Sequence, residues 1–346
     1  MKILNISYAL PSKCVDNDEM IEKIIDENRT HLSDEEQISL ESKIRRFFQM
    51  SGTETRFHRN VGEKALDFAL KAGREALKKA GVKPDDVDLL IYAGVGRGWV
   101  EPATANLFQS ELGLRSATCF DVLDACASWI RSLSIARSFL AQKIYKLVMI
   151  INCEFNFREY ANFEIKNSQQ LDNSFSAFTI GEAATATLLT ASESQEDDSH
   201  FSFRTWGEKH GLCKIPLPNA ADFSPNGGSE RIKPMSFFTV PAELLSFTIR
   251  KLVTHVKETH PVASRVHDIV IGHAVSNSST ARVVKMLGLE PDRVFETHSR
   301  FGNTVSASLP LALAVAEAEG KLRRGMRVML LMGSAGVTTA LGSFEY

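Results

Sequence analysis

The stretch Phe120-Asp121-Val122-Leu123-Asp124-Ala125-Cys126-Ala127, with the residues that follow it as far as Ile151, decides the fold. Residues 120–123 form a short run that predicts a strand. The next segment, 127–143, carries apolar side chains at the spacing of a helix: Ile130, Leu133, Ala136 and Leu140. Residues 146–151 are apolar and predict another strand. A strand, a helix and a strand in this order favour a parallel sheet and the α/β class.

The second half of the chain repeats this order. Residues 268–272 resemble an apolar run at 87–93, and residues 327–331 resemble the strand at 146–151. We therefore predict two copies of one strand–helix–strand plan, with the boundary in the polar, acidic stretch 192–199. The predicted domains are 1–195, which carries Cys126, and 196–346. The alternative is a doubly wound fold that alternates strands and helices without duplication.

Composition limits the partners and the compartment. The chain has 346 residues, enough for about two domains, with 44% hydrophobic and 24% charged residues. A net charge of −2 gives no electrostatic argument for binding nucleic acid or an anionic membrane. We also predict no membrane span, because long uncharged apolar runs are missing. Five cysteines without a CxxC motif predict neither a zinc ribbon nor a disulfide framework, and we expect a cytoplasmic protein with reduced thiols.

Cys126 is the first candidate for chemistry, because it follows a predicted strand and directly precedes a long predicted helix. The N–H groups and the positive dipole end of a helix N-terminus stabilise a thiolate, which is the nucleophilic form of cysteine. The alternative is a buried, inert thiol. Cys119, Cys153 and Cys213 lack this setting, so we expect them to be structural.

Three further features fall after predicted strands. His273 ends the strand at 268–272, where α/β proteins place functional groups. Asn303 lies in a tight turn before an apolar helix, and it is alternatively a turn residue or a helix cap. The turn 333–336 is rich in small residues, whose backbone N–H groups suit an oxyanion hole. Other histidines, His298 among them, have no comparable setting, and we expect them to be solvated or structural.

Together these motifs resemble the thiolase superfamily, and most closely its beta-ketoacyl-ACP synthase III branch. The resemblance runs nearly end to end, and the order and spacing of the motifs make it specific. The motifs are Ala9-Leu10-Pro11, Ser51-Gly52-Thr53 with Arg56, the nucleophile stretch 120–127, Gly272-His273-Ala274, and Phe301-Gly302-Asn303-Thr304-Val305-Ser306-Ala307-Ser308-Leu309-Pro310.

The resemblance implies a duplicated, five-layered αβαβα thiolase fold and a set of catalytic roles. Cys126 would attack an acyl thioester and become acylated, and the backbone N–H groups of Cys126 and Ala335 would form the oxyanion hole. His273 and Asn303 would stabilise the enolate of a second substrate. Neither a metal nor a redox cofactor is implied, and the expected partners are a second copy of the chain and an acyl-CoA or acyl carrier protein. The substrate-binding residues implied are Arg56, Gly302, Ser334 and Gly336.

The pair Glu101-Pro102 makes the resemblance more specific, toward one group of enzymes within the superfamily. Initiating synthases of fatty-acid synthesis usually carry an apolar residue at this position, whereas a Glu-Pro pair is similar to olefin-forming enzymes that join two long acyl-CoAs. In those enzymes the glutamate reaches across the dimer and acts as a base, and an apolar tunnel would raise its pKa. The alternative is a surface glutamate beside a turn proline.

Other positions depart from the family. Glu54 stands where initiating enzymes often have an arginine that contacts coenzyme A, and Glu182 lies where the usual motif is Gly-Asp-Gly-Ala. We therefore predict a Claisen-type condensation, with or without decarboxylation, in specialised lipid or secondary metabolism. One alternative is transfer of the acyl group to an alcohol or amine. The other is a non-catalytic thiolase-fold subunit of a hetero-oligomer.

Overall fold

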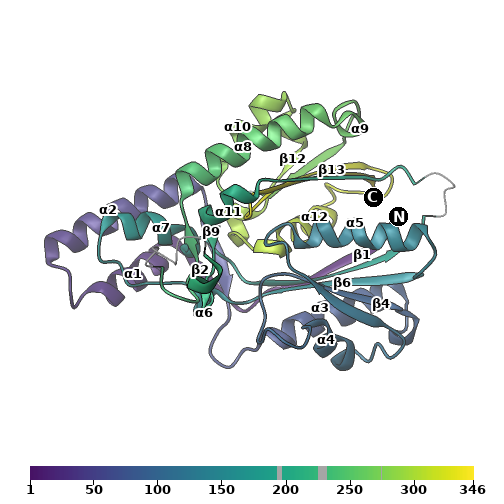
Figure 1. Cartoon of the computed structure of the whole chain (residues 1–346), viewed down its shortest axis with the longest axis horizontal. Coiled ribbons are helices and arrows are strands. Elements are labelled where there is room, and N and C mark those ends of the chain that lie inside the picture. Colours follow the sequence, from purple (N-terminus) through teal and green to yellow (C-terminus); the bar gives the residue numbers. More distant parts are fainter. Residues whose placement is uncertain (193–196, 225–231, 274) are drawn as a thin grey trace.

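The computed structural model describes residues 1–192, 197–224, 232–273 and 275–346. The predicted domain boundary between 195 and 196 and the predicted residue Ala274 lie outside these ranges. Two five-stranded sheets, stacked with helical layers, form the body of the molecule (Figure 1). Over the described ranges, none of the helices combines the length and the hydrophobicity that a bilayer span requires.

The first sheet has the order β1-β7-β6-β4-β5. Strands β6, β4 and β5 are parallel to one another, while β7 is antiparallel to both β6 and β1. The central strands are buried over their whole length, because helices cover both faces of the sheet. The strands are β1 (Lys2–Ala9), β4 (Leu89–Ala93), β5 (Thr118–Val122), β6 (Leu147–Glu154) and β7 (Ala183–Thr190).

The second sheet repeats the first strand for strand, in the order β12-β11-β13-β14-β8. Strands β12, β11 and β13 are parallel, and β14 is antiparallel to both β13 and β8. The shared order and directions confirm the predicted duplication. The strands are β8 (His200–Thr205), β11 (Ile269–Gly272), β12 (Val294–Phe295), β13 (Arg327–Ser334) and β14 (Thr338–Glu345).

Helices fill three layers around these sheets. In the centre, α5 (Ser128–Ala141) and α12 (Ser308–Ala318) lie between the two sheets (Figure 1). The sequence of α12 is apolar on all sides, which suits a helix with a sheet on either side. Outside the first sheet lie α3 (Ala65–Ala80) and α4 (Ala105–Glu111), and outside the second lie α8 (Pro241–Glu258), α9 (His260–Ala263) and α10 (Asn277–Leu287).

A cap of smaller elements extends from one end of these layers (Figure 1). Its core combines apolar side chains of α1 and α2 with those of α7, as in the contact of Phe47 and Phe48 with Phe175. Ser33 starts α2 with a reciprocal capping box to Glu36. The elements of the cap are β2 (Lys13–Asp16), α1 (Asn17–Asn28), α2 (Asp34–Ser51), β3 (Thr55–His58), α6 (Phe157–Tyr160), α7 (Ser168–Phe178), β9 (Cys213–Lys214), β10 (Phe238–Thr239) and α11 (His298–Phe301).

Candidate active site

A cavity of about 810 Å³ lies where the cap meets the two sheets. Cys126, His273 and Asn303 all line it, although they are far apart in the sequence. The size falls within the range of small-molecule sites. The structure therefore brings the three predicted catalytic residues to one place.

Cys126 sits in a tight turn between β5 and α5. The preceding residue, Ala125, has a φ of 46°, in the left-handed region that non-glycine residues rarely adopt. The Ser334 hydroxyl accepts a hydrogen bond from Ala127 N at 3.2 Å and donates one to Asp124 O at 3.1 Å. Ser334 of the second half thus holds the backbone on both sides of Cys126.

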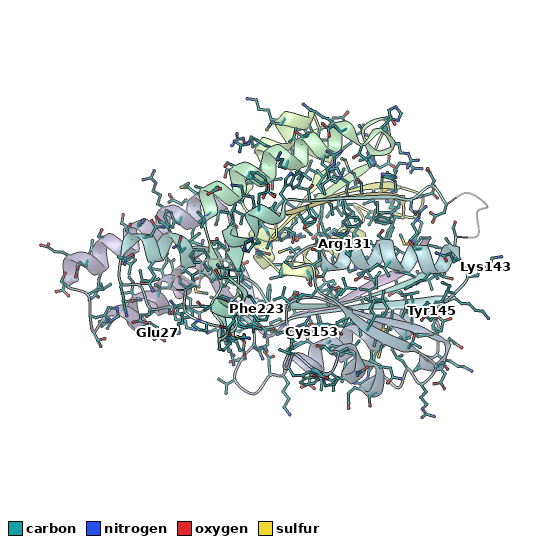
Figure 2. All side chains as sticks on the ribbon, in the orientation of Figure 1. Glu27, Arg131, Lys143, Tyr145, Cys153 and Phe223 are labelled. Carbon is teal, nitrogen blue, oxygen red and sulfur yellow. The ribbon has the colours of Figure 1, made fainter. Side chains whose placement is uncertain are left out.

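Arg131 makes further contacts that hold the turn around Cys126. Its guanidinium pairs with Asp124 at 2.8 Å and lies over the Phe203 ring of β8, 3.8 Å from the ring centroid. Figure 2 shows Arg131 on α5, where that helix faces the second half. The cysteine turn is therefore fixed by contacts with both halves of the molecule.

The protonation of Cys126 differs from the prediction. The thiol lies at the helix N-terminus as expected, yet burial raises its pKa well above the usual range, and Cys213, Glu154 and Asp124 raise it further. Burial of the thiol outweighs the helix dipole, because desolvation penalises the charged form of a buried group. At neutral pH, Cys126 is therefore a neutral thiol.

His273 follows β11, and its backbone N–H donates to Leu331 O at 2.8 Å. Burial lowers the pKa of its imidazole to about 4, and the charge of His298 contributes to the decrease. His273 is therefore neutral at pH 7. Its buried Nδ1 has no hydrogen-bond partner among the described residues.

Asn303 is held by backbone hydrogen bonds to Thr179 and Gly181, in the segment that leads into β7. Its backbone N–H donates to Thr179 O at 2.8 Å, and its carbonyl accepts from Gly181 N at 3.2 Å. Its side-chain Oδ1 accepts from Val305 N at 2.9 Å, so the free end of the amide is Nδ2, which can only donate. Gly302 is required before it, because a Cβ there would lie 2.5 Å from Thr179 O.

Glu154 is a cavity residue that the sequence analysis missed. It ends β6, is buried, and accepts hydrogen bonds from Val95 N at 3.0 Å, from Gly96 N at 2.9 Å and from the Ser306 hydroxyl. Burial raises the pKa of this carboxyl, while those three donors oppose the rise. A charged residue that ends the apolar run 147–154 was the available signal. Glu154 joins the loop after β4 to the segment that carries Asn303.

The other predicted site residues divide into two groups. Ser334 and Ala335 line the cavity, whereas Arg56, Gly302 and Gly336 do not. Arg56 is buried within the cap, where it donates to Asn17 Oδ1 at 2.8 Å and lies over Phe48. Its contact with substrate stays a prediction. Cys213, which we expected to be merely structural, lines the cavity with Cys126, and burial raises its pKa to about 12.

Glu101 lies outside the cavity of its own chain. It is exposed in the loop between β4 and α4, next to the exposed side chains of Trp99 and Val100. Asp121 fixes the far end of this loop by accepting hydrogen bonds from Thr104 N at 2.8 Å and Ala105 N at 2.9 Å. Within one chain, Glu101 is therefore not among the described residues that line the cavity with Cys126, His273 and Asn303.

The cavity has two walls of different chemistry. Toward α7 it is lined by polar side chains one helical turn apart, including Gln169, Asn173 and Ser176. Beneath α10 its lining is apolar. The residues on that side are Ile249, Leu252, Val270, Val283, Val284, Leu289, Val294 and Leu331.

We call the apolar part of the cavity beneath α10 the apolar branch. It exists because α10 does not pack closely against the second sheet. All residues of α10 are described and none is fully buried, although Val283, Val284 and Leu287 form an apolar side. Protein cores are normally packed to high density, so a space lined by so many core residues is a distinct feature of this site. Over the described ranges, no group of three His, Cys, Asp or Glu side chains is arranged to hold a metal ion.

Comparisons with known proteins identify the family. Residues 120–207 match the model of 3-oxoacyl-[acyl-carrier-protein] synthase III, and residues 260–346 match the C-terminal model of the same enzymes. The chain is 30% identical to beta-ketoacyl-[acyl-carrier-protein] synthase III of Symbiobacterium thermophilum over 279 residues, which cover 80% of this chain and 81% of that protein. The chain belongs to the beta-ketoacyl-ACP synthase III family.

A second curated relative agrees with this assignment, and two solved structures share the fold. The synthase III of Methylococcus capsulatus is also 30% identical, over 82% of this chain and 84% of its own. The crystal structure of 3-oxoacyl-[acyl-carrier-protein] synthase III from Aquifex aeolicus covers 100% of this chain and 99% of its own, with a TM-score of 0.81 and 24% identity. OleA of Xanthomonas campestris with bound cerulenin covers 99% and 96%, with a TM-score of 0.83 and 21% identity. The predicted thiolase fold is thus confirmed.

Proposed function

We propose that this family member catalyses a Claisen-type condensation of two acyl thioesters through an acylated Cys126. The observation that carries the proposal is one cavity lined by a thiol, a neutral imidazole and a side-chain amide donor, namely Cys126, His273 and Asn303. These groups match the two stages of such a reaction, capture of an acyl group and stabilisation of an enolate.

In the first stage, Cys126 Sγ attacks the carbonyl carbon of the donor thioester. The bond between that carbon and the donor sulfur breaks, and the donor thiol leaves with the proton that Cys126 gives up. Because the Cys126 thiol is neutral at rest, this proton needs an acceptor, and neutral His273 in the same cavity supplies one. The backbone N–H groups of Cys126 and Ala335 hold the negative oxygen of the tetrahedral intermediate.

In the second stage, the second thioester loses a proton or carbon dioxide at its α-carbon and becomes an enolate. His273 and Asn303 Nδ2 donate hydrogen bonds to the enolate oxygen. The α-carbon then attacks the acyl group on Cys126, a carbon–carbon bond forms and the cysteine sulfur leaves. Preorganised donors are most effective in such a cavity, because water is excluded from the developing charge.

The apolar branch beneath α10 favours a substrate with an alkyl chain. Residues such as Val270, Val283 and Leu331 give such a chain an apolar surface within the cavity. OleA, which shares the fold, has been crystallised with bound lauric acid and lauroyl-CoA. We infer that at least one of the two substrates carries an alkyl chain, delivered by coenzyme A or an acyl carrier protein, for a specialised lipid.

The exposed Glu101 completes this proposal as the base that deprotonates the second substrate in a homodimer. Its loop carries exposed apolar side chains, Trp99 and Val100, which suit a contact with a second copy. Because Glu101 lies outside its own cavity, it would act in the cavity of the partner. We expect Glu101→Gln to lower condensation on the order of 10²-fold while Cys126 acylation continues.

Complementation between two inactive variants tests this arrangement. Glu101→Gln and Cys126→Ala chains, coexpressed with different tags and purified as mixed dimers, should regain activity in one of the two cavities. The cavity that regains it keeps its own Cys126 and receives Glu101 from the partner. Mixed dimers as inactive as either parent would contradict a role across the interface.

Product analysis tests the reaction itself. The purified chain, incubated with pairs of labelled acyl-CoAs, should form a β-keto product that contains carbon from both chains. Cys126→Ala should form none. An ester or amide without a new carbon–carbon bond would instead support acyl transfer to an alcohol or amine. Full activity of Cys126→Ala within a hetero-oligomer would support a non-catalytic subunit.

A further inference from the structure

His298 lies outside the catalytic cavity and makes two hydrogen bonds that a neutral imidazole cannot make together. It begins α11, which α10 and β12 separate from His273 along the chain. Only 4% of its side chain is exposed. Its Nδ1 lies 2.7 Å from Glu296 Oε2, and its Nε2 lies 3.0 Å from the backbone carbonyl oxygen of Ser51. Both ring nitrogens therefore face oxygen atoms.

Neither of these oxygens can donate a hydrogen. The Ser51 carbonyl is only an acceptor. Glu296 also accepts hydrogen bonds from Ser299 N at 3.3 Å and from the Ser299 hydroxyl at 3.0 Å, donors that favour an ionised carboxylate, so it too only accepts. Each ring nitrogen of His298 must then carry a proton, which makes the side chain an imidazolium cation.

His255 provides an internal comparison. It is also fully buried and also bonded at both ring nitrogens, to Ser202 Oγ and Thr339 Oγ1, each at 2.8 Å. Hydroxyl groups donate or accept, so one neutral tautomer satisfies both contacts of His255. Burial lowers the pKa of His255 to about 4, consistent with a neutral ring. Burial and two partners do not by themselves make a histidine cationic; the acceptor-only partners of His298 do.

The cation joins the segment that carries Asn303 to the wall of the cavity. Ser51 lines the cavity at the end of α2, and α11 leads within two residues to Asn303. Two backbone contacts run parallel to this link: Glu54 N donates to Ser299 O at 2.9 Å, and Thr55 Oγ1 donates to Arg300 O at 2.7 Å. His298 contributes the charged member of the three contacts.

We propose that His298 is a positioning residue that is protonated at neutral pH, and that its imidazolium, paired with Glu296, clamps the Asn303 segment to α2 and holds a positive charge near His273. The catalytic consequence rests on the proposed condensation, whereas the protonation state does not. A fixed cation near His273 favours the neutral ring that the enolate stage uses as a hydrogen-bond donor.

Few other charges face this cation from the elements packed around it. On α11, Arg300 pairs with Glu319 at 2.7 Å and is exposed. The connection after α2 carries Glu54, which is exposed, and β3 carries the buried Arg56. From β11, His273 is neutral. Among these described groups, Glu296 pairs directly with His298, at 2.7 Å.

Nuclear magnetic resonance of the whole protein, labelled with ¹⁵N at histidine, tests the protonation state directly. At pH 7, both ring nitrogens of His298 should give the signals of protonated nitrogen, and both should vanish in His298→Gln. His255 should give one protonated and one unprotonated nitrogen. An unprotonated ring nitrogen in His298 at pH 7 would overturn the proposal, whatever reaction the enzyme catalyses.

Two charge-removing variants test the consequence. His298→Gln keeps a donor within reach of Ser51, and Glu296→Gln keeps an acceptor for His298, so each removes charge with little change of shape. Both should lower condensation roughly 10-fold while the rate of Cys126 acylation stays within about two-fold. His298→Gln should also raise the pH at which His273 titrates above its present value of about 4.

His255→Gln is the matched control, because it also removes a buried histidine bonded at both nitrogens. It should change neither the condensation rate nor the titration of His273. An equal loss of acylation and condensation in His298→Gln, with His273 titrating as before, would overturn the positioning role. Failure of the wild-type chain to form any acyl adduct would count against the proposed function, while the nitrogen signals would still decide the state of His298.

Discussion

The two halves share one strand plan but differ in how their outer helices meet the sheet. On the first sheet, the connection between the two parallel strands β4 and β5 includes α4, which buries Ala105 and Phe108. On the second, the matching connection between β11 and β12 includes α10, which buries no residue fully. The outer helix of the first half therefore packs closely on its sheet, whereas the outer helix of the second half leaves space that joins the cavity.

The candidate catalytic side chains are also divided between the two halves. The first half carries Cys126, the nucleophile that we propose, between the end of β5 and the start of α5. The second half provides His273 after β11 and Asn303 ahead of α12. In the proposed reaction, Cys126 of the first half takes the acyl group, while His273 and Asn303 of the second half stabilise the second substrate and His273 also serves the first stage. Duplication gave two similar frameworks, and the loops and helix packing at the strand ends made them different.

The largest expected effect comes from removing the donors of the second half. His273→Ala and Asn303→Ala should each lower condensation on the order of 10²- to 10³-fold, because each deletes a preorganised donor to the enolate oxygen. Cys126 should still accept an acyl group in Asn303→Ala, which leaves the thiol and His273 intact. Rapid-quench kinetics with intact-protein mass spectrometry would follow both steps.

His267→Ala is the control for this pair. It removes a buried histidine at the opposite end of β11, where Nε2 contacts Ser343 Oγ at 2.9 Å. Its acylation and condensation rates should fall together, if at all, through lower stability. If Asn303→Ala lost acylation and condensation equally, the division of roles between the halves would be wrong.

A pair of phenylalanine substitutions tests the difference in packing. Ala105→Phe, on closed α4, should lower the free energy of unfolding by about 1–3 kcal/mol, because no space exists for the ring. Val283→Phe, on open α10, should be tolerated, since its side chain faces the cavity. It should also reduce turnover of the longest acyl chain roughly 10-fold while short chains react normally.

Met286→Phe is the control on the same helix, because Met286 is exposed and does not line the cavity. It should leave stability and chain-length preference unchanged. Urea unfolding and a series of acyl-CoAs from short to long measure the two quantities. A strongly destabilised Val283→Phe with unaltered chain preference would show that the space beneath α10 is not a substrate branch.

The smallest effect concerns acid stability. Burial lowers the pKa to about 4 for His58 in the first half and for His255, His267 and His273 in the second. In the unfolded chain, histidine binds a proton near pH 6.5. The stability that each buried, neutral histidine contributes is therefore fully present above that pH and is lost as the pH falls from 6.5 toward 4. The loss at pH 5.5 is on the order of 1 kcal/mol for each buried histidine.

Three of these four histidines lie in the second half, so acid should weaken that half first. Hydrogen exchange at pH 7.5 and 5.5, corrected for the intrinsic rates, should show protection lost earlier in β13 and β14 than in β6 and β7. Equal loss in both sheets, or earlier loss in the first, would count against this difference.

Much of the fold was predictable because the signals were local. The apolar runs at 87–93, 146–151, 268–272 and 327–331 all became central strands, although the boundaries shifted by a few residues. The apolar sequence of α12 marked a helix between two sheets. Cys126, His273 and Asn303 were predictable from their places after strands and from their motifs, and the structure gathers them around one cavity.

Other parts depended on contacts that no local pattern encodes. The cationic state of His298 follows from two acceptors, one of them Ser51 O, 247 positions away in the chain. The raised pKa of the Cys126 thiol follows from burial beneath the cap, which overrides the helix dipole. The openness beneath α10 was also hidden, because its apolar spacing is that of any helix packed on a sheet.

The most direct test of the account compares the two thiols of the cavity by intact-protein mass spectrometry. Cys126 and Cys213 line the same space and both have raised pKa values, but only Cys126 occupies the turn at the start of α5. After incubation with acyl-CoAs and acyl carrier proteins of different chain length, wild type and Cys213→Ala should gain one acyl mass, and Cys126→Ala should gain none. An adduct that survives in Cys126→Ala and disappears in Cys213→Ala, or no adduct with any donor, would contradict the assignment of Cys126 as the nucleophile.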